Sequence, residues 1–505
     1  MGEVTARGST ARRSIGALTG ALLLLAPAPA TAAAPRPGTP EYVQRDNQNM
    51  ADAYGRETGR GGQLDNPNYL PALIAEGNDV GFSQLAQQAA QPNRPALTPG
   101  NVFPGWNVGN PLRRGWAGRR GLRVAVSWTN RYGALIRGHV WAPLPGARDP
   151  YTGRRLKPPY PGVVITTGSI QGSEGMYHWL AEDLAERGYL VLTYDVQGQG
   201  TSETLPHEND QVSALPFCNP FAKPKDGEAF GCPGVPSQQA SNFVTGTGDA
   251  LSFFLSTPRH RYGNRNGSDA PVNAFNPLWR LFDRRRDRRS ATRGRRTKVA
   301  IVGHSLGAFA VSYVQAVDRR VETLVALDKL ASKGQQGAAD LPPFKPVVPA
   351  LAVQSEYGFN VQPYTLSHGT SFNPAPGPPD QGPDPRREER TGFDAWRKAH
   401  VDSMLVVPRA STHLEYTDIS YVMPASRWGQ ALTSVYVQRW LDRYLKHRRV
   451  NLLAKSFRYL EPAAVGKWEP RKLDRASLLS FYFCSAYALG RRVDTDVAKV
   501  GGCPR

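Results

Sequence analysis

A short apolar run that ends in Gly303-His304-Ser305-Leu306-Gly307 restricts most strongly how this chain can fold. The β-branched residues before Gly303 are typical of a buried strand, and the small residues after Gly307 are compatible with a tightly packed helix. Glycine is frequent in the chain, with 50 residues, so the flanking pattern carries more weight than the pentapeptide itself. We expect Ser305 at a sharp strand-to-helix turn, with Gly303 and Gly307 allowing the close approach of neighbouring backbone. The run therefore predicts a nucleophile elbow.

Regular alternation of strand and helix patterns begins at Gly121. The first two predicted strands are separated by a polar turn, as in a hairpin, and the strand–helix–strand order that follows predicts a right-handed crossover in a mostly parallel sheet. The predicted strands are 122–129, 134–142, 161–166, 189–194, 298–304, 323–327, 349–354 and 404–407, and the predicted helices are 176–187, 242–256, 308–317, 393–399 and 425–446. The pattern indicates an α/β protein with a mostly parallel sheet flanked by helices.

With the elbow at the fifth strand, this order resembles the α/β-hydrolase superfamily from about Leu122 to Lys446. Several segments are similar to the platelet-activating-factor acetylhydrolase and dienelactone-hydrolase neighbourhood and to secreted bacterial hydrolases. These segments are Gly303-His304-Ser305-Leu306-Gly307, Ala326-Leu327-Asp328, Ser355-Glu356-Tyr357 and Ser411-Thr412-His413-Leu414-Glu415-Tyr416. The resemblance implies a hydrolase domain over 121–449, with loop-rich insertions at 205–297 that would roof the site as a lid. An N-terminal extension over 33–120 is expected to wrap this core, and a C-terminal extension covers 450–505.

The resemblance also implies a catalytic triad in the chain order serine, acid, histidine. Ser305 is the expected nucleophile, and His413 is the one histidine that follows the last predicted core strand by a short loop. Two residues compete for the acid. Asp328 follows the strand after the elbow helix, as in the acetylhydrolase family, and Glu356 follows the next strand, which is the commoner superfamily position. We favour Asp328, and we expect the Glu356 carboxylate either to position groups of the site without contacting His413 or to position the substrate.

An oxyanion hole needs two N–H donors directed at the developing negative charge. Elbow geometry makes the backbone N–H of Leu306 the first donor. By its match to the corresponding superfamily loop, Thr167-Gly168-Ser169-Ile170 should supply the second, and we choose the N–H of Ser169. The residue at 167 departs from the usual histidine or proline of that loop. The resemblance implies neither a metal ion nor an organic cofactor.

The first residues have the order of an export signal. Basic residues including Arg12 and Arg13 precede a short apolar run and then Ala30-Thr31-Ala32. We expect a signal peptide over 1–32, export by the Sec or the twin-arginine route, and no membrane-spanning segment in the mature chain. In an exported chain, four cysteines predict two disulfides. Proximity along the chain favours the pairs Cys218–Cys232 and Cys484–Cys503.

The chain carries a formal net charge of +20, and much of this charge is local. Ten basic residues and two acidic ones lie between Arg280 and Lys298. The stretch Arg284–Arg296 is either a contact for an anionic surface or a solvated arginine-rich loop. It lacks the interleaved aromatic residues that stack on bases, so a specific nucleic-acid partner is not expected.

These features together predict a secreted serine hydrolase of the esterase or lipase type. Its substrate would be a small or lipid-like carboxylic ester, cleaved through an acyl-enzyme. A peptidase or amidase would use the same three residues on a different leaving group. A third alternative, from another class, is a non-catalytic protein that binds the cell envelope on a hydrolase scaffold.

Overall fold

The computed structural model describes residues 34–55, 63–89, 108–169, 173–204, 236–265, 270–292, 294–295, 297–332, 341–418 and 427–503. The predicted signal peptide, the first cysteine pair and residues 205–235 of the predicted lid lie outside these ranges. Among the described residues, no helix combines the length and apolar character needed to cross a bilayer.

Ten strands in the described ranges form one sheet, in the order β1-β2-β4-β3-β5-β6-β7-β10-β13-β14. The central strands from β4 to β10 are parallel, and β1, β2, β13 and β14 pair antiparallel at the two edges. Their bounds are β1 Gly121–Thr129, β2 Leu135–Pro143, β3 Gly162–Thr166, β4 Leu190–Tyr194, β5 Val299–His304, β6 Thr323–Leu327, β7 Ala350–Val353, β10 Ser403–Val406, β13 Ala486–Leu489 and β14 Arg492–Asp494. An antiparallel hairpin followed by parallel strands in this order is the α/β-hydrolase fold, as predicted.

Alternation of side chains along the strands creates an apolar core on each face of the sheet. In β5, Val299 and Ile301 belong to one core, whereas Ala300 and Val302 belong to the other. Every residue of β5 is buried. This explains the continuous apolar run before the elbow, since a central parallel strand is covered on both faces.

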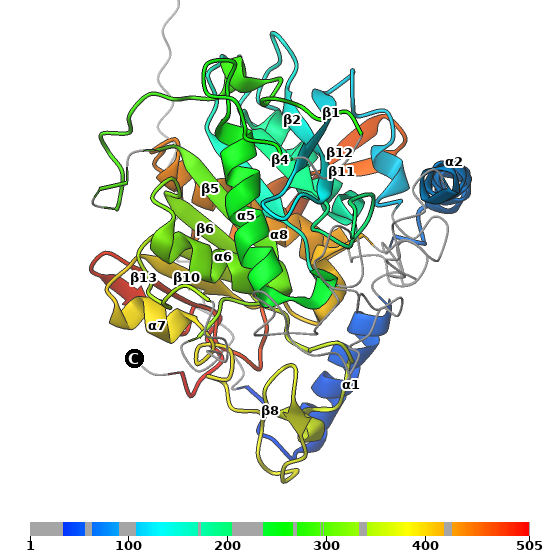
Figure 1. Ribbon diagram of the computed structural model, residues 1–505. Helices are drawn as coiled ribbons and strands as arrows, with labels where there is room; N and C mark the ends of the chain where they lie inside the picture. Colours follow the sequence, from blue (N-terminus) through cyan, green and yellow to red (C-terminus); the bar gives the residue numbers. More distant parts are fainter. Residues whose placement is uncertain are drawn as a thin grey trace, which may run out of the picture. The chain divides into compact units, whose positions relative to one another are not determined.

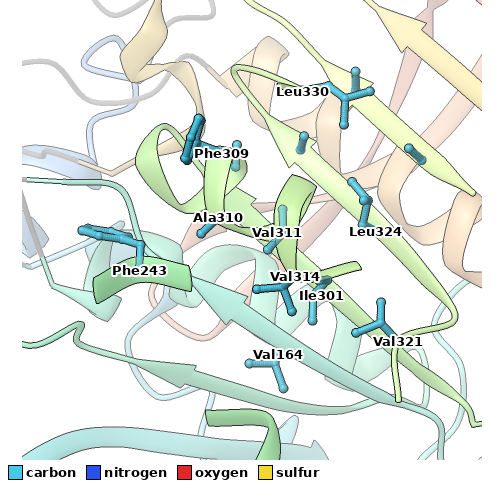
Figure 2. Packing of buried hydrophobic residues seen from close by; sticks show 14 of the residues in the cluster. Val164, Phe243, Ile301, Phe309, Ala310, Val311, Val314, Val321, Leu324 and Leu330 are labelled. Carbon is cyan, nitrogen blue, oxygen red and sulfur yellow. The ribbon is translucent and has the colours of Figure 1, made fainter. Parts of the chain in front are cut away.

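Helices cover both faces. The longer helices of this core are α4 His178–Glu186, α5 Ala240–Leu255, α6 Leu306–Val317, α7 Phe393–Lys398 and α8 Arg427–Tyr444. Side chains of α5, α6 and α7 pack in one core, and those of α4 and α8 pack in the other. Figure 1 shows α5 and α6 together in front of the sheet. Figure 2 shows Val311 and Val314 of α6 in the same cluster as Ile301 of β5 and Val164 of β3.

Segments outside the predicted core also form regular structure. Helices α1 Pro40–Gly55 and α2 Tyr69–Ala89 precede the sheet, and the hairpin β11 Ser456–Ala464 and β12 Lys467–Asp474 follows α8. The sheet does not end at β10, the last strand that the sequence predicts, because β13 pairs with β10 and β14 with β13. Residues after 449 therefore complete the main sheet. The disulfide between Cys484 and Cys503 is confirmed.

Candidate active site

Ser305 lies at the turn between β5 and α6, and its backbone is in a sparsely populated conformation with φ 54° and ψ −121°. Its N–H donates to the carbonyl of Leu327 at 3.0 Å, which ties the turn to the neighbouring strand β6. A non-glycine residue in such a conformation costs about 1–3 kcal/mol and needs support from the surrounding structure. The predicted strand–turn–helix arrangement around Ser305 is confirmed.

The two glycines of the motif are required by close backbone contacts. A Cβ atom at Gly303 would lie 2.1 Å from the carbonyl oxygen of Gly307. A Cβ atom at Gly307 would lie 2.4 Å from the carbonyl oxygen of Thr167. Both contacts involve backbone atoms that cannot rotate away, so the predicted steric role of the two glycines is confirmed.

His413 pairs with Asp328. The distance between Nδ1 of His413 and Oδ2 of Asp328 is 2.7 Å, and both side chains are buried. The Asp328 carboxylate also accepts hydrogen bonds from the hydroxyl of Ser355 at 2.6 Å and from its backbone N–H at 3.2 Å. Burial alone would raise the pKa of Asp328, but the hydrogen bonds from His413 and Ser355 and the charge of Lys329 hold it below its ordinary value. Asp328 is therefore an ionised partner for the imidazole.

Glu356, the other acid considered, lies in a separate hydrogen-bond network. Its carboxylate accepts hydrogen bonds at 2.6 Å from Asn49 of α1, from the backbone N–H of Ala410 and from the hydroxyl of Ser480. Burial raises the pKa of Glu356, and these donors partly offset the effect. The group thus connects helix α1 and the C-terminal region with the loop before His413.

His304, adjacent to Ser305 in the chain, links the elbow to His413. The ring centroids of His304 and His413 are 4.7 Å apart, and Nε2 of His304 lies 3.0 Å from the carbonyl oxygen of His413. A carbonyl oxygen can only accept, so Nε2 carries the hydrogen and Nδ1 accepts from the hydroxyl of Tyr177 at 2.8 Å. Burial, together with the neighbouring His413, lowers the pKa of His304 to about 3, so this ring is neutral.

The loop after β3 lies against the elbow. A Cβ atom at Gly168 would lie 3.2 Å from Cβ of Ser305 and 2.9 Å from Nδ1 of His304. The Gly168 N–H donates to the hydroxyl of Tyr177 at 2.9 Å, and the side-chain amide of Gln199 donates to the carbonyl of Gly168 at 2.8 Å. Ser169 is therefore the residue directly after Gly168, which closely approaches the elbow. Leu306, the other predicted oxyanion donor, follows Ser305 and is the first residue of α6. Residues 170–172 lie outside the described ranges.

Sequence reasoning missed Tyr177, His304 and Ser355 as parts of this site. Tyr177 links the Gly168 loop to His304, and Ser355 holds Asp328. Ser355 is the first residue of the segment Ser355-Glu356-Tyr357, and His304 lies within the elbow motif itself. No pattern in the sequence marked Tyr177, which falls at the end of a short 3-10 turn, Glu174–Tyr177.

Two exposed aromatic rings lie beside His413. Phe359 is 50% exposed and Phe372 is 36% exposed, and their ring centroids lie 4.6 and 5.0 Å from that of His413. The two rings also contact one another edge to face at 5.6 Å. An apolar surface therefore borders the imidazole.

The arginine-rich stretch is partly built into the core. Arg295 is buried and donates to the carbonyl of Gln315 at 2.9 Å, and Asp283 pairs with Arg285 and Lys298. Arg286, Arg288 and Arg289 are exposed. The contact of Arg284–Arg296 with an anionic surface stays a prediction, and Arg293 and Arg296 lie outside the described ranges.

Comparison with protein families finds no match, and comparison with curated proteins finds none either. Among solved structures, the chain is similar to a ferulic acid esterase from Streptomyces cinnamoneus, with 18% sequence identity and a TM-score of 0.38. The similarity covers 65% of this chain and 91% of that chain. The fold assignment rests on the strand order and on the position of the elbow after β5.

Proposed function

We propose that the protein is a serine hydrolase that cleaves carboxylic esters through an acyl-enzyme. One observation carries this proposal. The strained turn at Ser305 stands next to His304, whose ring contacts His413, and His413 is paired with the buried carboxylate of Asp328. Strain at a serine between a strand and a helix is expected where the hydroxyl must be presented to a substrate.

In the proposed reaction, Ser305 Oγ attacks the carbonyl carbon of the ester while His413 takes the hydroxyl proton. Nδ1 of His413 is directed at Asp328, so Nε2 is the nitrogen that accepts this proton. The protonated imidazole then gives the proton to the departing alcohol oxygen as the carbon–oxygen bond breaks. A water molecule, deprotonated by the same nitrogen, then attacks the acyl carbon. The bond between this carbon and Ser305 Oγ breaks, the acid leaves, and the imidazolium returns the proton to Oγ. Asp328 stabilises the imidazolium that forms twice in this cycle.

Two backbone donors would stabilise the oxyanion. The Leu306 N–H stands at the start of α6, where the helix dipole also favours negative charge. The Ser169 N–H is the second candidate, in the loop that packs on Ser305. Each such donor contributes about 3–4 kcal/mol to the stability of the transition state in acyl-transfer enzymes.

The aromatic pair Phe359 and Phe372 favours an ester with an apolar group. Exposed aromatic rings beside the proposed base offer apolar area that a substrate can cover, and binding sites of this kind are lined mainly by such side chains. We therefore infer that the acyl or alcohol part of the ester packs against these rings.

We also expect the enzyme to act outside the cytoplasm. The Cys484–Cys503 disulfide fits an oxidising compartment. The signal peptide over 1–32 and the export route stay predictions, and N-terminal sequencing of the mature chain from culture medium tests them.

A fluorophosphonate probe tests the nucleophile directly. We expect it to label the wild type and not Ser305→Ala, whereas Ser477→Ala, which changes an exposed serine far along the chain, should be labelled like the wild type. Turnover of a p-nitrophenyl ester series is then compared with a peptide panel. Cleavage of peptides alone would replace the ester assignment with a peptidase or amidase. Absence of both labelling and turnover would favour a non-catalytic envelope-binding protein.

A further inference from the structure

A second group of chemically active side chains lines a cavity at the β2–β4 side of the sheet. The cavity has a volume of about 700 Å³, and its lining includes His139, Glu174, His178, Asp195 and Thr201. His139 lies on β2, and Glu174 and His178 are four residues apart across the turn that leads into α4. Ser305, His413 and Asp328 do not line this cavity. The proposed hydrolysis uses none of its side chains.

We propose that His139, Glu174 and His178 form a binding site for a divalent transition-metal ion, with Zn²⁺ as the best-fitting ion. One donor atom from each side chain lies within 4.8 Å of the other two. Two ligands that each lie about 2.1 Å from a common ion can be at most about 4.2 Å apart, so small ring rotations bring the three donors onto one ion. Two imidazoles and one carboxylate form a ligand set for zinc and related ions, whereas Ca²⁺ and Mg²⁺ take oxygen ligands.

An unsatisfied nitrogen supports the site. Nε2 of His178 is buried and makes no hydrogen bond to any described residue. Its nearest carboxylate oxygen, Oε2 of Glu174, is 3.8 Å away, beyond hydrogen-bond distance. Buried polar atoms are normally satisfied, and an exception needs an explanation such as an ion. The ring of His178 packs against Trp141, whose ring centroid lies 4.6 Å away, and this contact holds it in place.

The carboxylate of Glu174 is oriented by its surroundings. It contacts Nδ1 of His139 and the hydroxyl of Thr193, and the Glu174 backbone N–H donates to Asp195 at 2.6 Å. Hydrogen bonds of this kind position metal-binding groups in proteins. Three protein ligands at the wall of a cavity leave a fourth position for water or a small anionic ligand.

Zinc uptake by the full, untagged chain tests this site without reference to hydrolysis. We expect calorimetry and metal analysis after dialysis to give one Zn²⁺ per chain. His139→Ala and His178→Ala should each weaken binding by more than about tenfold, because loss of a direct ligand should cost at least as much as loss of a supporting group. His260→Ala removes an exposed histidine away from the cavity and should bind like the wild type. Ser305→Ala should also bind normally, which separates this site from the proposed function.

Two results would overturn the site: no zinc uptake by the wild type at micromolar concentration, or equal affinity in the wild type and His178→Ala. If the alanine variants do not fold, as judged by circular dichroism, His178→Gln retains most of the side-chain volume and is expected to show the same loss. Co²⁺ provides a readout on the wild type alone. A visible absorption spectrum of tetrahedral Co²⁺ with nitrogen and oxygen ligands is expected, and a spectrum identical to that of free Co²⁺ would contradict the assignment.

Discussion

Asp328 and Glu356 are both buried carboxylates that follow parallel strands, but they have different partners. Asp328 contacts His413, whereas Glu356 receives three donors from Asn49, Ala410 and Ser480. None of the three donors to Glu356 is the imidazole of His413, and together they fix the surrounding backbone. Glu356 accordingly acts on His413 only through the loop that carries it.

Asp328→Asn and Glu356→Gln are expected to separate these roles. Asp328→Asn should lower kcat by about 10³–10⁴, because an amide no longer holds the imidazole in the required tautomer. Glu356→Gln should retain activity within about tenfold of the wild type. It should lose about 1–3 kcal/mol of stability, because the new amide NH₂ group would face N–H and O–H groups that now donate to the carboxylate. Steady-state kinetics and urea unfolding of both variants give the comparison. A larger kcat loss in Glu356→Gln would identify Glu356 as the acid.

Tyr177→Phe tests the link between the Gly168 loop and His304. Removing the hydroxyl leaves the Gly168 N–H and Nδ1 of His304 without this partner, which should cost about 1–3 kcal/mol of stability. Tyr313→Phe is the matched control, since the buried Tyr313 hydroxyl makes no hydrogen bond to the described residues. Thermal melts should show a clear loss for Tyr177→Phe and almost none for Tyr313→Phe. Equal melting temperatures for the two variants would show that the link contributes nothing to stability.

For individual residues, residue type and chain order were enough to select Ser305 and His413 as candidates. They were not enough to choose between Asp328 and Glu356, because both follow strands that end at the same edge of the sheet. The hydrogen bond to His413 depends on how the loops after β6, β7 and β10 lie together. Tyr177 was missed because its hydroxyl joins two different segments, the loop at Gly168 and the elbow at His304, which is 127 positions away.

At the scale of elements, the contact between α6 and the loop after β3 depends on Gly307. Gly307→Ala would place a methyl group 2.4 Å from a backbone carbonyl, and overpacking of this kind typically costs about 1–3 kcal/mol. Gly55→Ala is the control, because no atom lies within 4 Å of a Cβ at that position. We expect a lower urea midpoint for Gly307→Ala and an unchanged or slightly higher one for Gly55→Ala. A wild-type midpoint for Gly307→Ala would contradict the close approach.

The central strands were predicted to within one or two residues because they are continuous apolar runs, buried on both faces. Helix α1 was not predicted. Its buried residues are Tyr42, Asp46 and Asn49, so it packs largely through polar side chains and lacks an apolar stripe. Strands β13 and β14 were also missed, since runs of four and three residues carry little periodic signal.

At the scale of the whole molecule, a buried acid joins the arginine-rich segment to the sheet. Glu322 precedes β6 and accepts hydrogen bonds from the hydroxyl of Ser290 at 2.5 Å and the N–H of Ala291 at 2.8 Å. Burial, with the charge of Asp287 added, raises the pKa of Glu322 to about 7 despite the hydrogen bonds and the charge of Arg295. The folded state therefore prefers the protonated acid.

The sign of the resulting pH dependence follows from this raised pKa. The stabilisation is complete below the ordinary pKa of 4.5 and is lost as the pH rises through about 7. Between pH 5 and 8, the free energy of unfolding of the wild type should fall by about 1–3 kcal/mol more than that of Glu322→Gln. Urea unfolding at several pH values measures the difference. Parallel curves for the two proteins would show that Glu322 does not titrate in this range.

The disulfide between Cys484 and Cys503 closes a loop that contains β13 and β14, with a sequence separation of 19. Replacing both cysteines with serine should lower the free energy of unfolding by about 2–4 kcal/mol, chiefly because the unfolded chain gains conformational entropy when the cross-link is removed. Chemical denaturation of the wild type and of the double variant checks this value. In the double variant, hydrogen exchange should show earlier opening of β13 than of β5. If the free energy of unfolding of the double variant equals that of the wild type, pairing with β10 is enough to hold β13 in place without the disulfide.

The sequence by itself determined the mostly parallel sheet, the strained elbow at Ser305 and the identity of the histidine candidate, because buried strands and sharp turns place local demands on residue type. Only the tertiary structure decided that Asp328 is the partner of His413, that Glu356 connects both ends of the described chain, and that His139, Glu174 and His178 meet at one cavity. Most of these contacts join residues from different elements of the chain. Their geometry depends on how loops and helices pack, and local sequence patterns carry no record of that packing.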